Sequence, residues 1–360
     1  MVSVEQRLKQ LCIVAQAFFS DALTKSDEAI DYLEERGLVE TDVYNFGLGY
    51  CHRGLVKYFT YTSTIEKLLP YYNNAKGLSS KEDFIDVLHN DLVKIGLLGQ
   101  NEDRMYPVLN ERVIFPIKDV NGDIVSFAGR VINQKSSAKY INGKTSAIYE
   151  KNETIYGLER IKLTGRKMRF IPVLEGYLDV IAMGRVGLFS AALCGTACTK
   201  EHLAKLFHYT DMLVMCLDGD KAGLEAMMKS VVVSLPLLEG NRSIMVKLLD
   251  VGEDPDSIIT KSLETTPLEQ VKRSMLNILS DSVSLAELLE ISVEKDYPND
   301  PKMQDIALAS YALKAPINSS ARSEILNKIT LRGARFEQAD LNQATATVAE
   351  VSNSELRLSP

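Results

Sequence analysis

The chain has 360 residues, of which 46% are apolar and 25% charged, and its formal net charge is −7. This is the composition of an ordinary globular protein, long enough for two or three domains, and it argues against a surface that is basic throughout. No apolar run reaches the roughly 18 residues that span a bilayer, and the first residues lack the form of a signal peptide, so we expect an intracellular protein without a membrane partner.

The first hundred residues predict mainly helices. Residues 25–38 carry apolar side chains at helical spacing behind Ser26, a good N-cap, and residues 81–98 form a second amphipathic pattern. Between them, residues 44–56 are rich in glycine and aromatic residues, which favours a short strand and a turn.

The pattern changes at residue 111. Two β-branched runs flank Asn121-Gly122, the dipeptide most typical of a tight hairpin. Residues 111–170 hold 12 Lys and Arg against 6 Asp and Glu, which makes this segment +6 within an acidic chain. A solvated basic face and a surface for nucleic acid both fit that charge.

Short apolar runs then alternate with helical segments. This alternation predicts a parallel sheet with helices on its faces, an α/β architecture. The expected strands are residues 169–176, 188–195, 211–219 and 243–250, and the expected helices 179–186, 200–207 and 222–235. Residues 265–345 are again helical, with turns at 297–301 and 315–316, and the polar end is expected to be frayed.

Five cysteines give no disulfide framework and indicate a reducing compartment. Cys194 and Cys198, followed by His202 and His208, could form a zinc site. There is no second pair of cysteines, however, and the segment reads as a strand and a turn. We therefore expect no structural zinc in this chain.

Acidic residues follow three of the four predicted strands. Ligands of an open parallel sheet bind beyond the carboxyl ends of its strands, so these acids should gather at one edge. They are Glu175 with Asp179, then Asp218 and Asp220, then Asp250 with Glu253, Asp254 and Asp256.

The spacing of these acids favours a metal site. Asp218 and Asp220 project the same way from an extended segment, and Glu175 and Asp179 share a face of a helical turn. Gathered carboxylates raise one another's pKa unless a cation neutralises them, and all-oxygen ligands suit Mg²⁺ or Mn²⁺. Such ions serve phosphoryl or nucleotidyl transfer and phosphodiester cleavage. The alternative is that each acid only caps the next helix, and Asp179 fits that reading well.

The ordered set Glu175-Gly-Tyr-Leu-Asp179, Asp218-Gly-Asp220 and Glu253-Asp-Pro-Asp256 resembles the Toprim domain. More narrowly, it is similar to the RNA polymerase core of bacterial DnaG-type primases. RVIFPIKDVNGDIVSFAGR, AKYIN, YEKNETIYGL and ALCGTACT match further elements of that family in the same order. The likeness covers about residues 40–260, with a weaker helical likeness to about 340.

The resemblance implies an enzyme of DNA replication that makes short RNA primers on single-stranded DNA. By that likeness Glu175, Asp218 and Asp220 hold the catalytic metals, and Asp179, Asp254 and Asp256 complete or orient the cluster. The same likeness assigns the contacts with template or nucleotide phosphates to Arg112, Arg130, Lys139, Tyr140, Asn142 and Lys151. The expected partners are template DNA, NTPs, the RNA–DNA hybrid product, a replicative helicase and a separate zinc-bearing module.

The implied layout has four segments. They are a mixed α+β basic subdomain (1–165), a Toprim domain (166–264), a helical subdomain (265–345) and a tail (346–360). The family's N-terminal zinc ribbon and C-terminal helicase-binding domain have no match, which resembles compact phage or plasmid primases and would place the protein in the host cytoplasm. GKTS at 143–146 and FAGR at 127–130 depart from the family pattern.

Two other classes remain open. A Toprim nuclease or topoisomerase-like enzyme would share the acids, but the upstream RVIFPI and KYIN elements belong to the primase likeness. A non-catalytic replisome protein that binds nucleic acid predicts loss of acids, whereas all the expected ones are present.

Overall fold

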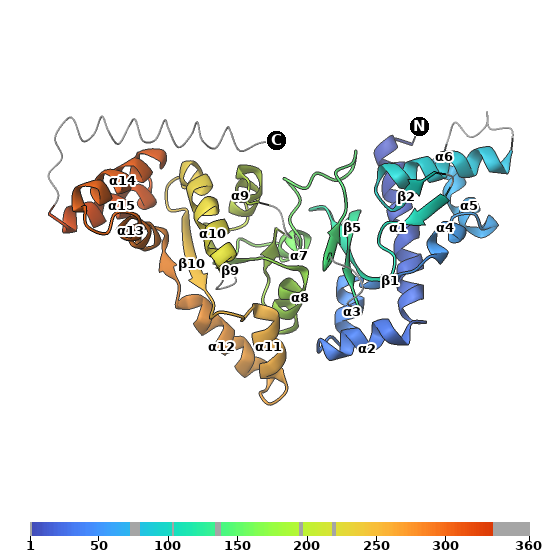
Figure 1. The fold of residues 1–360 in the computed structure, drawn as a ribbon, viewed down its shortest axis with the longest axis horizontal. Coiled ribbons are helices and arrows are strands. Elements are labelled where there is room, and N and C mark those ends of the chain that lie inside the picture. Colours follow the sequence, from blue (N-terminus) through green and yellow to red (C-terminus); the bar gives the residue numbers. More distant parts are fainter. Residues whose placement is uncertain are drawn as a thin grey trace. The chain divides into compact units, whose positions relative to one another are not determined.

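The computed structural model describes residues 2–72, 80–102, 104–133, 138–193, 197–217 and 221–333, with only the backbone for 221–227. The chain divides into two compact units, Met1–Glu159 and Arg160–Pro360 (Figure 1). Within the described ranges, no helix is long and apolar enough to cross a membrane. The predicted boundaries at 165, 264 and 345 stay a prediction.

The first unit begins with a long amphipathic helix, α1 (Val4–Leu23). Ser3 caps its start by accepting a hydrogen bond from the Gln6 N–H, and the Gln6 side chain accepts one from the Ser3 N–H. Residues such as Leu11 and Phe19 on one face are buried. The other helices are α2 (Asp27–Glu35), α3 (Glu40–Phe46), α4 (Gly54–Tyr58), α5 (Thr62–Leu68), the 3₁₀ turn η1 (Leu69–Tyr71) and α6 (Lys81–Lys94).

A four-stranded antiparallel sheet forms the centre of this unit, in the order β1-β4-β5-β6. The predicted hairpin is confirmed, since the strands on either side of Asn121-Gly122 pair directly and Gly122 takes φ +90°. The strands are β1 (Gly49–Cys51), β4 (Arg112–Lys118), β5 (Ile124–Val131) and β6 (Tyr140–Asn142), with a separate hairpin of β2 (Leu98–Asn101) and β3 (Arg104–Pro107).

Helix α1 packs directly on one face of this sheet. A Cβ atom at Gly49 would lie 2.6 Å from the Cβ of Phe19, so only glycine permits this approach. The Phe19 ring meets the Phe127 ring of β5 at 5.1 Å between centroids. This packing covers one face of the sheet with apolar side chains.

The strand and turn predicted for residues 44–56 are only partly right. Strand β1 is present, but α3 extends to Phe46 and a further helix, α4, begins at Gly54. Gly47 ends α3 at φ +67°, and the imidazole Nδ1 of His52 accepts a hydrogen bond from the Gly54 N–H. This short-range side-chain bond starts α4 within a segment whose composition favours a turn.

The second unit is built on the predicted parallel sheet. Its order is β11-β10-β9-β7-β8, and every pair is parallel except β10 with β11. The predicted α/β fold class, a parallel sheet flanked by helices, is therefore confirmed. The strands are β7 (Ile171–Leu174), β8 (Ala191–Ala192), β9 (Met212–Leu217), β10 (Ser243–Leu248) and β11 (Val283–Ser284).

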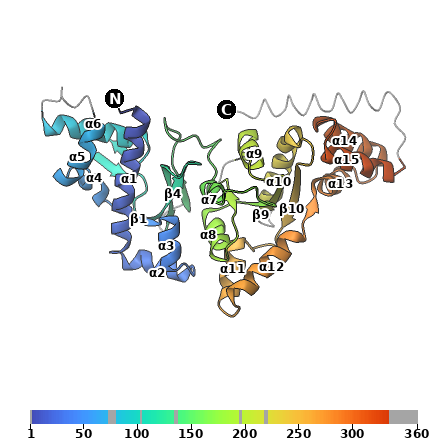
Figure 2. The same cartoon turned by 180° about the vertical axis from the view of Figure 1, so that it is seen from behind.

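The helices of this unit follow the strands as expected, and a helical subdomain ends the described chain. Helices α8 and α11 lie side by side in both views (Figures 1 and 2). The helices are α7 (Leu158–Leu163), α8 (Tyr177–Arg185), α9 (Lys200–Phe207), α10 (Lys221–Ser234), the 3₁₀ turn η3 (Leu235–Leu237), α11 (Pro255–Leu263), α12 (Leu268–Ser280), α13 (Leu285–Asp296), α14 (Pro301–Lys314) and α15 (Ser320–Leu331).

A buried acid ties α1 to α6 in the first unit. The Asp91 carboxylate lies 2.9 Å from Arg7 Nε and 3.1 Å from Lys94 Nζ, and it accepts a hydrogen bond from the Tyr72 hydroxyl at 3.2 Å. The Asp91 side chain is only 2% exposed. Removal of the Asp91 carboxylate would leave Arg7, Lys94 and the Tyr72 hydroxyl without this partner.

We predict that Asp91→Ala lowers the free energy of unfolding of the first unit by about 3 kcal/mol. Chemical denaturation followed by circular dichroism measures this, with each unit's transition fitted separately because a two-unit chain need not unfold in one step. Asp21→Ala is the matched control, since its pair with Lys25 is solvent-exposed and should contribute below about 0.5 kcal/mol. Equal losses in both variants would contradict the role given to Asp91.

Candidate active site

Glu175 stands at the carboxyl end of β7. All four residues of the strand are buried, and Glu175 directly after it is exposed. The next residue, Gly176, is the N-cap of α8, and a Cβ atom there would lie 3.0 Å from a carboxylate oxygen of Asp179. The tight strand-to-helix connection therefore leaves the Glu175 carboxylate at the edge where ligands of a parallel sheet bind.

Asp179 is buried in the first turn of α8. One carboxylate oxygen accepts the Gly176 N–H at 3.0 Å, and the other accepts the Asp256 N–H at 3.2 Å. Burial, together with the nearby Asp254 carboxylate, raises the pKa of the Asp179 carboxyl to about 7, although the two N–H groups act to lower it. Asp179 thus joins the starts of α8 and α11.

The acids after β10 belong to the start of α11. Asp254 is the N-cap, and its carboxylate accepts the Ser257 N–H at 2.6 Å. Asp256 is 6% exposed, and its carboxylate accepts a hydrogen bond from the Thr260 hydroxyl at 3.4 Å. The same hydroxyl accepts one from Arg185 of α8 at 3.2 Å. A chain of hydrogen bonds therefore runs along the α8–α11 contact.

The structure brings Asp179, Asp254 and Asp256 together beyond the strand ends. Strand β9 runs parallel to β7 and ends at Leu217, the residue before Asp218. Asp218 and Asp220 themselves lie outside the described residues. Among the residues that are described, no three His, Cys, Asp or Glu side chains are arranged to hold a metal ion.

The carboxylate oxygens of these acids are nevertheless the kind of ligand that a divalent cation prefers. Asp179 is a buried carboxyl beside the carboxylates of Asp254 and Asp256, and burial together with Asp254 raises its pKa. Oxygen donors of this kind suit Mg²⁺ or Mn²⁺. Both carboxylate oxygens of Asp179 accept backbone N–H groups, which fits a role in orienting the strand ends. The Glu175 side chain, in contrast, is exposed.

His202 and Cys198, two of the residues considered above for a zinc site, have contacts of other kinds. His202 is fully buried in the first turn of α9, where its Nδ1 accepts the Thr199 N–H at 3.3 Å. Burial raises the pKa of the Cys198 thiol to about 11, which disfavours the thiolate that zinc requires. Cys194 lies outside the described residues.

Three of the assigned basic and polar residues share one face of the first unit's sheet. Arg130 pairs with Tyr140 across β5 and β6, and Asn142 lies two residues along, so all three project from the same side. Arg130 donates to the Tyr140 hydroxyl at 2.8 Å and is only 6% exposed. The face opposite α1 therefore carries a preformed arginine–tyrosine pair.

Arg112 has a different position from the one expected of a phosphate contact. It is 4% exposed, and its guanidinium donates to the carbonyls of Gly129, Ala138 and Lys139 at 3.2, 3.0 and 3.3 Å. Burial lowers its pKa. Arg112 thus holds the segment that carries Lys139, whose own side chain is exposed, and Lys151 is half-buried.

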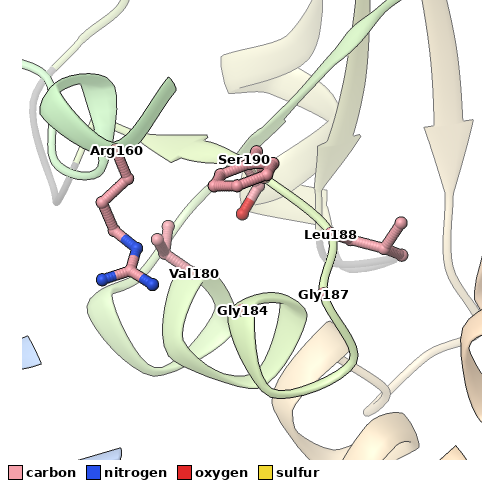
Figure 3. A pocket seen from close by; sticks show the side chains of 7 residues that line it. Arg160, Val180, Gly184, Gly187, Leu188 and Ser190 are labelled. Carbon is pink, nitrogen blue, oxygen red and sulfur yellow. The ribbon is translucent and has the colours of Figure 1, made fainter. Parts of the chain in front are cut away.

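A small cavity lies at the other end of α8. It measures about 60 Å³ and is lined by residues of α7, α8 and the connection to β8, including Arg160, Val180 and Ser190 (Figure 3). The Ser190 hydroxyl is buried and has no protein partner there. This volume suits ordered water rather than a nucleotide.

Sequence reasoning did not find Thr260, Arg185 or the structural role of Arg112. Thr260 lies one helical turn after Asp256, a spacing that could have suggested the hydroxyl-to-carboxylate bond. Arg185 and Arg112 gave no local signal, because their partners come from distant parts of the chain.

Comparisons with known proteins match both units. Residues 18–162 match the DNA primase catalytic core N-terminal domain, and residues 172–259 match a Toprim-like domain. The DNA primase of Rickettsia bellii is 32% identical over 69% of this chain and 38% of that protein. The DNA primase of Pasteurella multocida is 28% identical over 97% of this chain and 56% of that protein. The chain thus spans about half, or less, of the length of these relatives.

Solved structures match nearly the whole chain. A DNA primase domain from Pseudomonas aeruginosa superposes with a TM-score of 0.76 at 27% identity, covering 94% of this chain and 99% of that one. A DnaG primase catalytic domain bound to single-stranded DNA has the same fold, with a TM-score of 0.73 at 24% identity over 91% of this chain and 98% of that one. The chain belongs to the family of DnaG-type primase catalytic cores, with a primase N-terminal domain followed by a Toprim-like domain.

Proposed function

We propose that the chain is the catalytic core of a DNA primase. It would synthesise short RNA primers from NTPs on single-stranded DNA and release an RNA–DNA hybrid. The observation that carries this proposal is the exposed Glu175 at the carboxyl end of β7, beside the buried Asp179, in a Toprim-like domain that follows a primase-specific one. The primase-specific match also favours this reaction over that of a Toprim nuclease or topoisomerase.

The metal assignment is part of this proposal. Toprim domains of primases are metal-dependent, and we assign Mg²⁺ or Mn²⁺ to Glu175, Asp218 and Asp220. When bound, such an ion would supply charge neutralisation for the triphosphate and lower the pKa of the attacking primer hydroxyl. Asp179 and Asp254 act differently, because their oxygens fix the first turns of α8 and α11 and so orient the edge.

The strand face of the first unit would hold phosphates. Arg130, Tyr140 and Asn142 on this face stay assigned to template or nucleotide, as do Lys139 and Lys151 outside it, and Arg112 contributes by holding the carbonyls of residues 138 and 139. A basic surface lets a negatively charged template approach a chain whose net charge is −7. A replicative helicase and a separate zinc-bearing module belong to the same proposal and rest on the family resemblance.

The first prediction from this proposal concerns Glu175. Glu175→Gln keeps the size but removes the charge, so primer synthesis should fall by about 100-fold or more, and Mn²⁺ binding measured by calorimetry should weaken. Asp218→Asn and Asp220→Asn should behave alike. Glu269→Gln, an exposed acid at the start of α12, is the control. Normal synthesis by Glu175→Gln would remove it from the site, and DNA nicking without primers would favour a nuclease.

The second prediction concerns pH and Asp179. Its pKa of about 7 lies above the ordinary value of 3.8, so the folded, metal-free protein binds this proton more tightly than the unfolded chain does. Its stability should therefore fall as pH rises from about 4 to 7. Asp179→Asn does not ionise, so its free energy of unfolding should change less over that range in the presence of a chelator. Parallel curves for the two proteins would contradict the raised pKa.

The third prediction concerns Lys139. Lys139→Ala should weaken binding of single-stranded DNA, and the slope of log affinity against log salt should become shallower by about 0.7, the loss of one phosphate contact. Fluorescence anisotropy at several salt concentrations measures both. Lys67→Ala, at the exposed end of α5, is the control. Unchanged affinity at low salt would remove Lys139 from the template surface.

A further inference from the structure

The densest basic run of the chain is not among the assigned residues. Residues 160–169, RIKLTGRKMR, hold five Lys and Arg and no acid. The side chains of Lys162, Arg166, Lys167 and Arg169 are exposed. A Cβ atom at Gly165 would meet no other atom within 4 Å, so the turn after α7 stands in open solvent.

Hydrogen bonds and an ion pair place this run at the amino ends of the parallel strands. The Met168 N–H donates to the Tyr209 carbonyl at 2.7 Å, and Lys167 Nζ lies 2.6 Å from the Asp211 carboxylate. The Asp211 carbonyl in turn accepts the Ser243 N–H at 2.8 Å. The run therefore borders the starts of β7, β9 and β10, the edge opposite Glu175.

The charge at this edge is positive. We define the amino-edge cluster as Lys162, Arg166, Lys167, Arg169 and Arg242. Acids pair with two of its members. Asp211 is held by Lys167, and Glu239 lies 3.9 Å from Arg242. The acids at the carboxyl ends of the same strands make the other edge negative. The two edges are separated by a four-residue strand, roughly 13 Å long.

We propose that the amino-edge cluster binds the sugar–phosphate backbone of the nucleic acid at a distance from the acidic edge. This inference rests on the proposed function, which supplies a long polyanion as ligand. Exposed lysine and arginine side chains neutralise phosphates without reading sequence, as a template of any sequence requires. Lys167 is held by Asp211 and so anchors the run, while Arg166 and Arg169 carry exposed guanidinium groups.

The exposed surface also argues against an acidic protein as the ligand. Specific protein interfaces centre on buried apolar anchors. Within residues 160–169, Leu163 is the one large apolar side chain that is strongly exposed, at 84%. A lone apolar residue among cations fits a charged polymer better than a folded partner.

The test replaces three cations by neutral residues of similar size, as Lys162→Gln, Arg166→Gln and Arg169→Gln together. Affinity for a 30-nucleotide single strand at low salt should fall roughly tenfold or more, and the salt slope should become shallower by about 2. The matched control is Lys261→Gln, Arg273→Gln and Lys295→Gln, three exposed cations of the same unit.

Three results would overturn the proposal. They are an unchanged affinity and salt slope for the 30-nucleotide strand, an equal loss of affinity in the control variant, and displacement of the strand by polyglutamate as effectively as by DNA. Circular dichroism confirms that the variant is folded. Primer synthesis by the wild-type protein is measured separately, so that its absence would contradict the proposed function while the binding comparison still decides this site.

Discussion

The contact between α8 and α11 depends on one buried carboxylate. Asp179 accepts backbone N–H groups from the starts of both helices, and those two hydrogen bonds place the connection after β7 against the connection after β10. The Arg185–Thr260–Asp256 hydrogen bonds extend this polar link along the same two helices. A buried carboxylate is costly, and the raised pKa of Asp179 reflects that cost.

This arrangement separates two roles among the acids. The residues that shape the edge are buried or serve as helix caps, and Glu175 remains exposed where a cation and phosphates can approach. A similar separation appears in the first unit, where the Arg112 guanidinium donates to backbone carbonyls and the Lys139 side chain is exposed. Both units therefore hold their buried charged side chains in place with backbone groups.

The pattern of the sequence was sufficient for most secondary structure. The Asn121-Gly122 hairpin, helix α9 and the parallel strands follow from local residue choice and periodicity. Strand β11 and helix α4 were missed. Two residues are too few to show a strand period, and the glycine at the start of α4 is more typical of a turn. Strand β8 is shorter than its apolar run predicts, since only Ala191 and Ala192 pair with β7.

By itself, the sequence determined the order of strands and helices, the acids that follow the strands and the family of the chain. These are properties of neighbouring residues and of ordered motifs, which a linear chain displays directly. Only the tertiary structure decided that Asp179 is buried and accepts the Gly176 and Asp256 N–H groups, that Arg112 donates to the carbonyls of residues 129, 138 and 139, and that residues 160–169 border the amino ends of the parallel strands. Each of these depends on hydrogen bonds between segments far apart in the chain, and no local pattern specifies which distant partner a polar side chain will meet.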